Sequence, residues 1–336
     1  MNYVLIDTAN MFFRARHVAH RASNSEEKIG YALHITLAAI NKVAKKFNAD
    51  HVIFALEGRS WRKDMYKPYK ANRTETRAAM SEAEQEEDKL FWETYDQFTT
   101  FLVNGTNCSV IRHPEAEADD IIARFIALHP NDRHTIVSSD TDFVQLLNSN
   151  VEQYNGINNE LLTLVGVFDD KGKQVIDKKT KQPKVVPNPD WLLFEKCMRG
   201  DVSDNIFSAY PGVRTKGTKN KVGLLEAFED RNKKGFAWNN LMLQKWVDHN
   251  NNEHRVLDDY ERNRLLIDLK AQPTEIKQKV DTAITEQISK KDIGQVGIRF
   301  MKFCGRFDLQ KISESAEQYS NWMNKHYEGV LNGNIG

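Results

Sequence analysis

The stretch EADDIIARFIALHPNDRHTIVSSDTDF (residues 117–143) contains a predicted helix, a predicted strand and two acidic motifs. Apolar residues recur at helical spacing at 119–128, and a short apolar strand follows at 135–138. This strand leads directly into Asp140 and Asp142. A helix followed by a short buried strand is the repeating unit of an α/β fold. Carboxylates just past such a strand lie where these folds bind their ligands.

The alternation continues on both sides of this stretch. We expect strands at residues 3–6, 51–56 and 108–111, because each is a short apolar run. Helices are expected at 33–47 and 81–101, where apolar residues recur every three to four positions. Together these elements predict the α/β class, with a mostly parallel central sheet flanked by helices.

The sequence changes in character after residue 151. Residues 156–187 are rich in lysine and turn residues and indicate β-hairpins or a loop inserted into the α/β part. From about residue 201 onward the pattern is mainly helical. We therefore expect an α/β core at residues 1–200 and a helical region at 201–336.

The composition excludes several classes of protein. The chain has 336 residues, 40% of them apolar, which is enough to bury a substantial core. No run approaches the roughly 18 apolar residues of a membrane span, and residues 1–7 lack the pattern of a secretory signal. We therefore expect a cytoplasmic protein without membrane association. The three cysteines are too far apart in sequence to indicate a disulfide framework or a zinc site.

The formal net charge is zero, which by itself argues against a nucleic-acid partner. The distribution of charge argues the opposite. Basic residues gather at 59–73, 171–184 and 214–221, whereas acids gather at 82–88 and in the two acidic motifs. A protein that holds cations and also binds phosphates would balance its charge in this way.

Acids from separate segments are expected to meet at one edge of the predicted sheet. Asp7 ends the first strand, Glu57 ends the second, and Asp140 follows the fourth. Like-charge repulsion would leave several such acids neutral unless cations compensate. Ligand sets made only of oxygen select Mg²⁺ or Mn²⁺ over zinc, and two such ions about 4 Å apart can hydrolyse a phosphodiester. The candidate ligands are Asp7, Glu57, Glu117, Asp119, Asp120, Asp140, Asp142, Asp201 and Asp204.

Each acid taken alone has an ordinary structural explanation. Asp7 could be a turn residue, Asp204 an N-cap, and Glu117 part of a solvated helix start. The metal-site interpretation depends on the co-occurrence of four acidic sets, each at a strand end or a helix start.

Residues 59–73 mix cations with aromatic residues. Cations attract phosphates, and ring faces allow bases to stack, as single-strand binding requires. A surface loop of lysines with partly buried stems is the alternative. The candidate nucleic-acid contacts in this segment are Arg59, Trp61, Arg62, Lys63, Lys67 and Tyr69.

Five motifs, in this order, resemble those of the 5′ nucleases of the flap endonuclease type, especially the stand-alone viral members, which include viral RNase H enzymes. The motifs are Leu5-Ile6-Asp7, Trp61-Arg62-Lys63 with Tyr69-Lys70-x-Asn72-Arg73, Glu117-Ala118-Asp119-Asp120, Ser138-Ser139-Asp140-x-Asp142-Phe143, and Gly200-Asp201-x-x-Asp204-Asn205. The resemblance covers about residues 1–230.

The resemblance implies a metal-dependent nuclease that removes 5′ flaps or RNA primers from duplex DNA. Two Mg²⁺ ions, for which Mn²⁺ can substitute, would be held by the acids. Asp7, Glu57, Glu117 and Asp119 would surround the first ion, and Asp140, Asp142, Asp201 and Asp204 would serve the second or the region between. Lys70 and Arg73 would contact the scissile phosphate and stabilise its developing charge.

The resemblance also implies an arrangement of parts and partners. The core would carry a helical arch at about 61–101, and the helical region would bind DNA through a modified helix-hairpin-helix at about 204–229. Expected partners are branched or 5′-ended duplex DNA, RNA–DNA hybrids, and replication proteins such as a clamp, a polymerase or a single-strand-binding protein. We expect a monomer, in the host cytoplasm if the protein is viral.

Two positions depart from the family pattern. Glu57 stands where the family usually has Asp, so an additional methylene must be absorbed locally. The segment after Tyr210-Pro211-Gly212-Val213 is longer and more basic than the usual hairpin, so lysine contacts could replace amide contacts, and a K⁺ site there is in doubt. The basic residues of this segment are Arg214, Lys216, Lys219 and Lys221.

Other classes of function stay open from sequence. A small ribonuclease of the PIN type shares an α/β core and an acidic cluster, but it usually lacks the arch and the helical C-terminal third. A nucleic-acid structure-binding protein that keeps the fold without cleaving is the alternative from another class. A phosphatase or kinase is less favoured, since no glycine-rich phosphate loop follows a strand.

Overall fold

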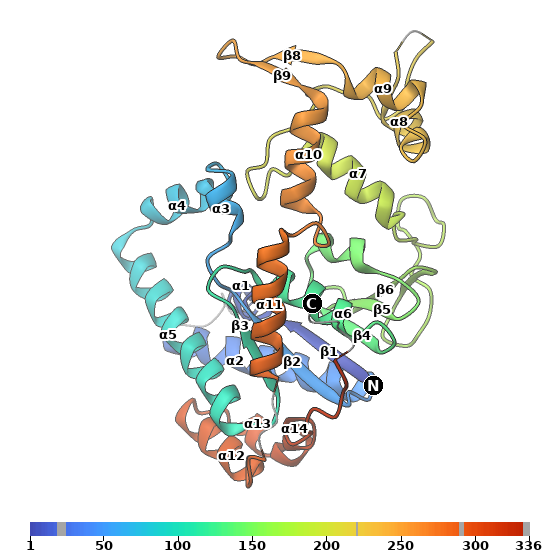
Figure 1. Cartoon of the computed structure of the whole chain (residues 1–336). Helices are drawn as coiled ribbons and strands as arrows, with labels where there is room; N and C mark the ends of the chain where they lie inside the picture. Colours follow the sequence, from blue (N-terminus) through green and yellow to red (C-terminus); the bar gives the residue numbers. More distant parts are fainter. Residues whose placement is uncertain (19–24, 220, 289–291, 332–336) are drawn as a thin grey trace. The chain divides into compact units, whose positions relative to one another are not determined.

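The computed structural model describes residues 1–18, 25–219, 221–288 and 292–331 (Figure 1). The chain divides into two compact units. The first comprises Met1–Ser60, Ala79–Val186 and Thr274–Gly336, and the second comprises Trp61–Ala78 and Pro187–Pro273.

A seven-stranded sheet forms the centre of the first unit. Its strands, in spatial order, are β3 (Ser109–Arg112), β2 (His51–Leu56), β1 (Asn2–Asp7), β4 (Arg133–Val137), β5 (Val151–Asn155), β6 (Glu160–Thr163) and β7 (Gly166–Phe168). The first five pair in parallel, whereas β6 and β7 are antiparallel. The prediction of a mostly parallel sheet is therefore confirmed, and the inserted segment forms hairpins that extend it.

Helices cover both faces of this sheet. Val4 and Ile6 of β1 lie in one apolar core with residues of α1 (Thr8–Val18), α2 (Ser25–Lys46), α5 (Glu82–Gly105), α12 (Val296–Arg306) and α14 (Ala316–Met323). Tyr3 points to the opposite face and meets Phe125 of α6 (Ala118–Leu128) edge to face, with ring centroids 5.1 Å apart. Burial on both faces explains why β1 and β2 read as continuous apolar runs.

The helices after residue 273 belong to the first unit rather than to a separate helical region. Phe300 of α12 and Trp322 of α14 lie in the core beneath β1 and β2. Helix α11 (Thr274–Gln287) precedes them in the chain, and the short α13 (Gln310–Ser313) lies between them. The observed division thus differs from the boundary expected near residue 200, because apolar helix faces distant in sequence complete the core of the sheet.

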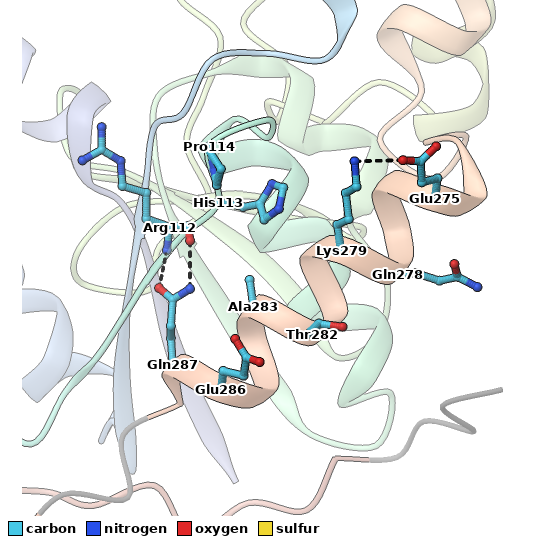
Figure 2. Close-up of a pocket in the computed structure, with 10 residues that line it drawn as sticks. All are labelled: Arg112, His113, Pro114, Glu275, Gln278, Lys279, Thr282, Ala283, Glu286 and Gln287. Carbon is cyan, nitrogen blue, oxygen red and sulfur yellow. Dashed lines mark hydrogen bonds and ion pairs between the residues drawn. The ribbon is translucent and has the colours of Figure 1, made fainter.

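A shallow groove of about 400 Å³ runs beside the outer strand β3 (Figure 2). Gln287 of α11 accepts a hydrogen bond from the Arg112 N–H and donates one to the Arg112 carbonyl, both at 2.9 Å. These bonds occupy an edge that could otherwise pair with another strand. Lys279, in the same groove, forms ion pairs with Glu115 and Glu275 at 2.7 and 2.8 Å. These hydrogen bonds and ion pairs therefore hold α11 against the edge of the sheet.

The second unit is mainly helical. It contains α3 (Arg62–Met65), α4 (Ala71–Ala78), α7 (Pro189–Arg199), α8 (Leu224–Asp230), α9 (Phe236–Met242), the hairpin of β8 (Lys245–Val247) with β9 (Glu253–Arg255), and α10 (Val256–Ile267). Its core gathers Phe194, Trp238, Tyr260 and Leu266. The end of α7 needs Gly200, because φ is +78° and a Cβ would lie 2.3 Å from the Ile206 carbonyl oxygen.

The predicted helix at 81–101 is confirmed as α5 and extends to Gly105. Ser81 caps it in a capping box with Glu84. The segment expected to form an arch therefore contains α3 and α4 of the second unit and α5 of the first. Every helix in the described part of the chain is too short or too polar to cross a membrane.

Candidate functional site

Three acids follow neighbouring strands of the first unit at the same edge of the sheet. Strand β1 lies between β2 and β4, and the register pairs Asp7 with Ala55 of β2 and Ile6 with Val137 of β4. Glu57 and Asp140 come two and three residues after these partners. Because adjacent strands are about 4.8 Å apart, the structure brings all three acidic segments together.

A chain of hydrogen bonds joins the acids after β1 and β4. Ser138 Oγ donates to Asp7 Oδ2 at 2.9 Å and accepts from the Asp140 N–H at 3.1 Å. The Asp142 N–H in turn donates to Asp140 Oδ1 at 2.9 Å. The other carboxylate oxygen of Asp7, Oδ1, accepts a hydrogen bond from the Asn10 N–H at 3.3 Å. Ser138 and Asn10 were not among the predicted site residues, although both flank predicted acids in sequence.

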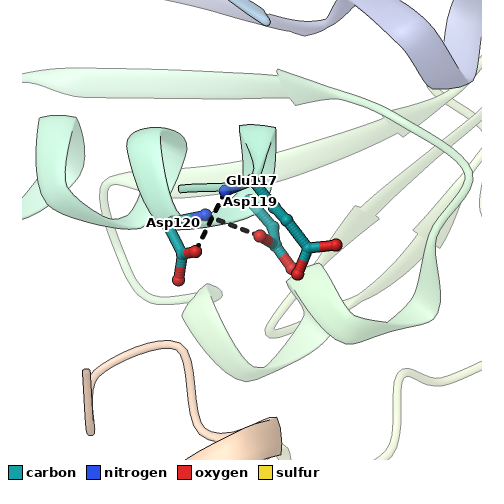
Figure 3. Close-up of side chains that lie close together, drawn as sticks. All are labelled: Glu117, Asp119 and Asp120. Carbon is teal, nitrogen blue, oxygen red and sulfur yellow. Dashed lines mark hydrogen bonds between the residues drawn. The ribbon is translucent and has the colours of Figure 1, made fainter. Parts of the chain in front are cut away.

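The start of α6 carries a crowded group of three carboxylates (Figure 3). One oxygen from each of Glu117, Asp119 and Asp120 lies within 4.8 Å of the others. The Glu117 N–H donates to Asp120 Oδ2 at 3.1 Å, and the Asp120 N–H donates to Asp119 Oδ1 at 2.7 Å. Glu117 and Asp120 are buried, whereas Asp119 is half-buried. The positive end of the helix dipole stabilises this concentration of negative charge.

Glu57 is tied to the same helix start. Its Oε2 accepts a hydrogen bond from the Ala118 N–H at 3.3 Å, and Ser60 Oγ donates to Glu117 Oε2 at 2.8 Å. Gly58 allows this close approach, because a Cβ there would lie 2.0 Å from the His113 carbonyl oxygen. The end of β2 and the start of α6 therefore form one acidic surface in the first unit.

The donor set fits a hard divalent cation. The clustered donors are all carboxylate oxygens, which suit Mg²⁺ and Mn²⁺ better than zinc. Oxygens bound to one Mg²⁺ lie at most about 4 Å apart, and those of Glu117, Asp119 and Asp120 lie within 4.8 Å of one another, which is close to that separation.

The negative charges of these acids also affect the pKa values of two further residues, Arg14 and Tyr95. Arg14 of α1 is half-buried; burial lowers the pKa of its guanidinium, and the charges of Asp140 and Asp7 oppose that shift. Burial raises the pKa of Tyr95 on α5, and the charges of Glu57 and Asp7 raise it further. Sequence reasoning missed both. The only signal was the spacing from Asn10 to Arg14, which places them on one helix face.

Asp204 lies in the second unit and is surrounded by cations and a hydroxyl. Its Oδ1 accepts from Arg73 at 2.9 Å, and its Oδ2 accepts from the Tyr69 hydroxyl at 3.1 Å. Lys70 Nζ lies 3.6 Å from Oδ2, and the Lys70 N–H donates to the Asp204 carbonyl at 2.8 Å. The two cations predicted to meet phosphate are thus held together by a single predicted metal ligand.

Asp201 is similarly engaged within the second unit. Lys196 Nζ lies 2.9 Å from its Oδ2, and Ser203 Oγ donates to its Oδ1 at 2.6 Å. Burial raises the pKa of Asp201, but the hydrogen bonds from Ser203 and Lys196 outweigh it, and the pKa is lowered overall. Asp201 therefore carries a negative charge.

The structure corrects part of the expected nucleic-acid surface at residues 59–73. Trp61, Arg62 and Tyr69 are only 4%, 1% and 3% exposed, so their rings and guanidinium cannot meet a substrate. Arg62 Nε instead donates to the Leu266 carbonyl at 2.7 Å, and Tyr69 packs in the core of the second unit. The rings of Trp61 and Tyr69 are therefore part of the protein interior rather than of a binding surface. Arg59, Lys63 and Lys67 are exposed.

The basic segment between α7 and α8 is exposed at each predicted contact: Arg214, Lys216, Lys219 and Lys221. The glycine amides nearby are already engaged. Glu226 Oε2 accepts from the N–H groups of Gly217 and Gly223, each at 3.0 Å. Side-chain cations are therefore better placed to meet phosphates here than these two amides.

Comparison with known proteins agrees with this geometry. A family model described as the 5′-3′ exonuclease, N-terminal resolvase-like domain, matches residues 2–179. A 5′-3′ exonuclease of Mycoplasmopsis pulmonis is 26% identical over 230 residues, covering 68% of each chain. A flap endonuclease Xni of Shewanella woodyi is 27% identical, covering 67% of this chain and 77% of the relative. A DNA polymerase I of Chloroflexus aurantiacus is 29% identical, but the match spans only 21% of that protein.

Solved structures share the fold. The T5 5′-exonuclease with bound zinc has a TM-score of 0.58 at 20% identity, covering 85% of this chain and 99% of that one. The T5 D15 protein co-crystallised with metal ions has a TM-score of 0.55 at 18% identity, covering 95% and 100%. The family model spans more than half of the 336 residues. The chain therefore belongs to the 5′-3′ exonuclease family, through its N-terminal resolvase-like domain.

Proposed function

We propose that this chain is a metal-dependent 5′ nuclease that hydrolyses phosphodiester bonds near the 5′ ends of flaps or RNA primers on duplex DNA. One observation carries the proposal: acids from three neighbouring strand ends and from the start of α6 gather at one edge of the sheet. The chain's relatives are named 5′-3′ exonuclease and flap endonuclease.

The first metal would be held by Asp7, Glu57, Glu117 and Asp119. Ser138, Asn10 and Ser60 orient two of these carboxylates, because the first two donate to Asp7 and Ser60 donates to Glu117. When bound, two Mg²⁺ ions, or Mn²⁺ in their place, supply an activated water and stabilise the leaving oxygen. The T5 neighbours were crystallised with metal ions, which supports a divalent cation here.

Asp140 and Asp142 extend the acidic edge of the first unit and would serve the second metal. Asp201 and Asp204 remain predicted ligands of that ion. Asp120 is completely buried and accepts from the Glu117 N–H, so in this proposal it also orients Glu117.

Lys70 and Arg73 would bind the scissile phosphate. Cations placed beside the developing charge lower the barrier to hydrolysis. Asp204 holds the two side chains close together, which reduces the entropy lost when they engage one phosphate.

The proposed substrates are branched or 5′-ended duplex DNA and RNA–DNA hybrids. A T5 flap endonuclease structure contains DNA together with metal ions, which supports a DNA substrate. Exposed cations at Arg214, Lys216, Lys219 and Lys221 would bind duplex phosphates without reading sequence. Replication proteins such as a clamp or a polymerase remain proposed partners, and action as a monomer remains proposed.

The proposal is tested by cleavage of a labelled 5′-flap duplex by the purified chain with and without Mg²⁺. We expect a short 5′ product with Mg²⁺, none with EDTA, and a loss of at least a hundredfold in the Asp142→Asn variant. Asp292→Asn is the matched control, because this side chain is 95% exposed and pairs with His326 rather than with the acidic edge. No product from the wild type would favour a non-cleaving structure-binding protein.

A further inference from the structure

Phe207, in the second unit, combines an exposed ring with a fixed backbone. Its side chain is 58% exposed. Its carbonyl accepts hydrogen bonds from Asn263 at 2.8 Å and from Arg262 at 3.3 Å, and its N–H donates to the Tyr66 hydroxyl at 3.4 Å. The backbone of Phe207 is thus held from both sides, while its ring stays exposed. Such preorganisation reduces the entropy that a ligand must overcome on binding.

The surroundings of Phe207 are aromatic and cationic. Its ring meets that of Tyr66 at an interplanar angle of 82°, with centroids 6.3 Å apart. The guanidinium of Arg262 lies over the Tyr66 ring at 5.1 Å. Tyr66 is half-buried, so Phe207 is the more exposed ring of this edge-to-face pair. Met65 adds a further exposed apolar side chain beside Tyr66.

The same turn that presents Phe207 also holds the cations proposed for phosphate. Asp201 and Ile206 exchange two backbone hydrogen bonds of 2.9 and 2.8 Å, which close the turn immediately before Phe207. Asp204, within that turn, binds Arg73 and lies 3.6 Å from Lys70 Nζ. An exposed ring three residues after the acid that holds these cations is the pattern expected of a single-strand binding surface.

Exposed lysines also flank Tyr66 in sequence. Lys63 and Lys67 are both exposed on the segment that carries this ring. A partner strand of nucleic acid supplies phosphates for these cations and a flat apolar base for the ring, whereas an apolar protein surface would leave the cations without partners. The exposed cations therefore favour nucleic acid, rather than an apolar protein surface, as the ligand that contacts Phe207.

We propose that Phe207 stacks on an unpaired nucleobase of the substrate strand, beside the phosphate that Lys70 and Arg73 bind. The inference rests on the proposed nuclease function and specifies the part of the substrate that is recognised, namely a base not paired in a duplex. Stacking accepts any base, because every base has a π face. Phe207 thus takes the role expected of Trp61 and Tyr69, whose rings are buried.

The test measures binding without cleavage, in EDTA. The probes are a single-stranded oligonucleotide and a 5′-flap duplex, each with 2-aminopurine in the unpaired segment, and a blunt duplex. Phe207→Ala should weaken binding of the first two about tenfold, which corresponds to ~1.4 kcal/mol, and abolish the change in 2-aminopurine fluorescence. Binding of the blunt duplex and the salt dependence should be unchanged. Phe207→Tyr should bind as the wild type does, whereas Phe207→Leu should behave like Phe207→Ala.

The matched control is Phe236→Ala, since Phe236 is 81% exposed on α9 of the same unit. Equal affinities of Phe207→Ala and Phe236→Ala would overturn the inference, as would wild-type affinity in Phe207→Leu or an equal loss on the blunt duplex. If any of these contrary binding results were found while the wild type cleaved with Mg²⁺, the stacking role would be excluded but the nuclease function would be retained. A Phe207-dependent fluorescence change in a chain that cleaves nothing would retain the stacking role and remove the nuclease assignment.

Discussion

Ser138 Oγ donates a hydrogen bond of 2.9 Å to Asp7 Oδ2 and thereby joins the ends of two neighbouring strands. Both residues are buried, at 2% and 7% exposure. The same hydroxyl accepts from the Asp140 N–H, so one serine orients an acid from each strand. Groups that orient metal ligands often affect metal affinity and activity nearly as much as the ligands themselves.

We expect Ser138→Ala to raise the Mg²⁺ concentration for half-maximal activity about tenfold, since Asp7 loses the donor that sets its orientation. Direct titration of Mg²⁺ by calorimetry should show the same loss of affinity. Ser109→Ala is the control, because its buried hydroxyl bonds His51 Nε2 at 2.8 Å instead of an acid of the edge. A similar effect in both variants would mean that Ser138 acts only through stability.

Lys70→Ala should reduce the single-turnover cleavage rate by at least tenfold while changing substrate affinity much less. The reason is that its charge meets the phosphate most strongly in the transition state. Rapid-quench measurements at saturating enzyme separate the two quantities. Lys67→Ala, which removes an exposed lysine of the same segment, should instead weaken binding and leave the rate intact. A pure loss of affinity in Lys70→Ala would contradict this role.

Replacing both Lys216 and Lys219 with alanine should weaken duplex binding and flatten its dependence on salt. Each lost phosphate contact lowers the slope of log K against log salt by about 0.9. Fluorescence anisotropy between about 50 and 200 mM salt measures that slope. Lys302→Ala, which removes an exposed lysine of α12, should leave it unchanged. An unaltered slope in the double variant would exclude these lysines from phosphate binding.

Stability should fall in mild acid because of buried histidines. Burial lowers the pKa of both His51 and His134 to about 4. Unfolded histidine titrates near pH 6.5, so between these values the unfolded chain binds protons that the folded chain does not. The free energy of unfolding is therefore largest above about pH 6.5 and decreases down to about pH 4, by on the order of 3 kcal/mol for each histidine.

Urea unfolding at several pH values between 4 and 7 measures this decrease. His134→Phe should flatten it, because both ring nitrogens of His134 are buried without a hydrogen-bond partner among the described residues. The variant should also be at least as stable as the wild type at pH 5. If His134→Phe kept the pH dependence of the wild type, protonation of His134 would not contribute to the loss of stability in acid.

Local patterns allowed much of the first unit to be predicted. Strands β1 to β4 are short apolar runs and helix α5 has a helical periodicity, and Asp7, Glu57 and Asp140 lie at or within three residues of the ends of their strands. Parallel strands place their carboxyl ends at one edge, so the meeting of these acids follows from strand order.

Other features depend on contacts between distant residues. The burial of Trp61 and Tyr69, the ion pairs of Asp204 with Lys70 and Arg73, and the inclusion of α12 and α14 in the sheet's core are examples. Local periodicity does not reveal which distant element each of these residues contacts.

The order of the amino acids alone thus specified the α/β alternation and the acids at strand ends, because backbone geometry and apolar periodicity act locally. Only the folded chain decided which rings stay in solvent and which cation meets which acid. Phe207 is exposed and Tyr69 is buried, although both are aromatic. Burial and charge pairing depend on neighbours brought close by folding, and sequence distance does not reveal those neighbours.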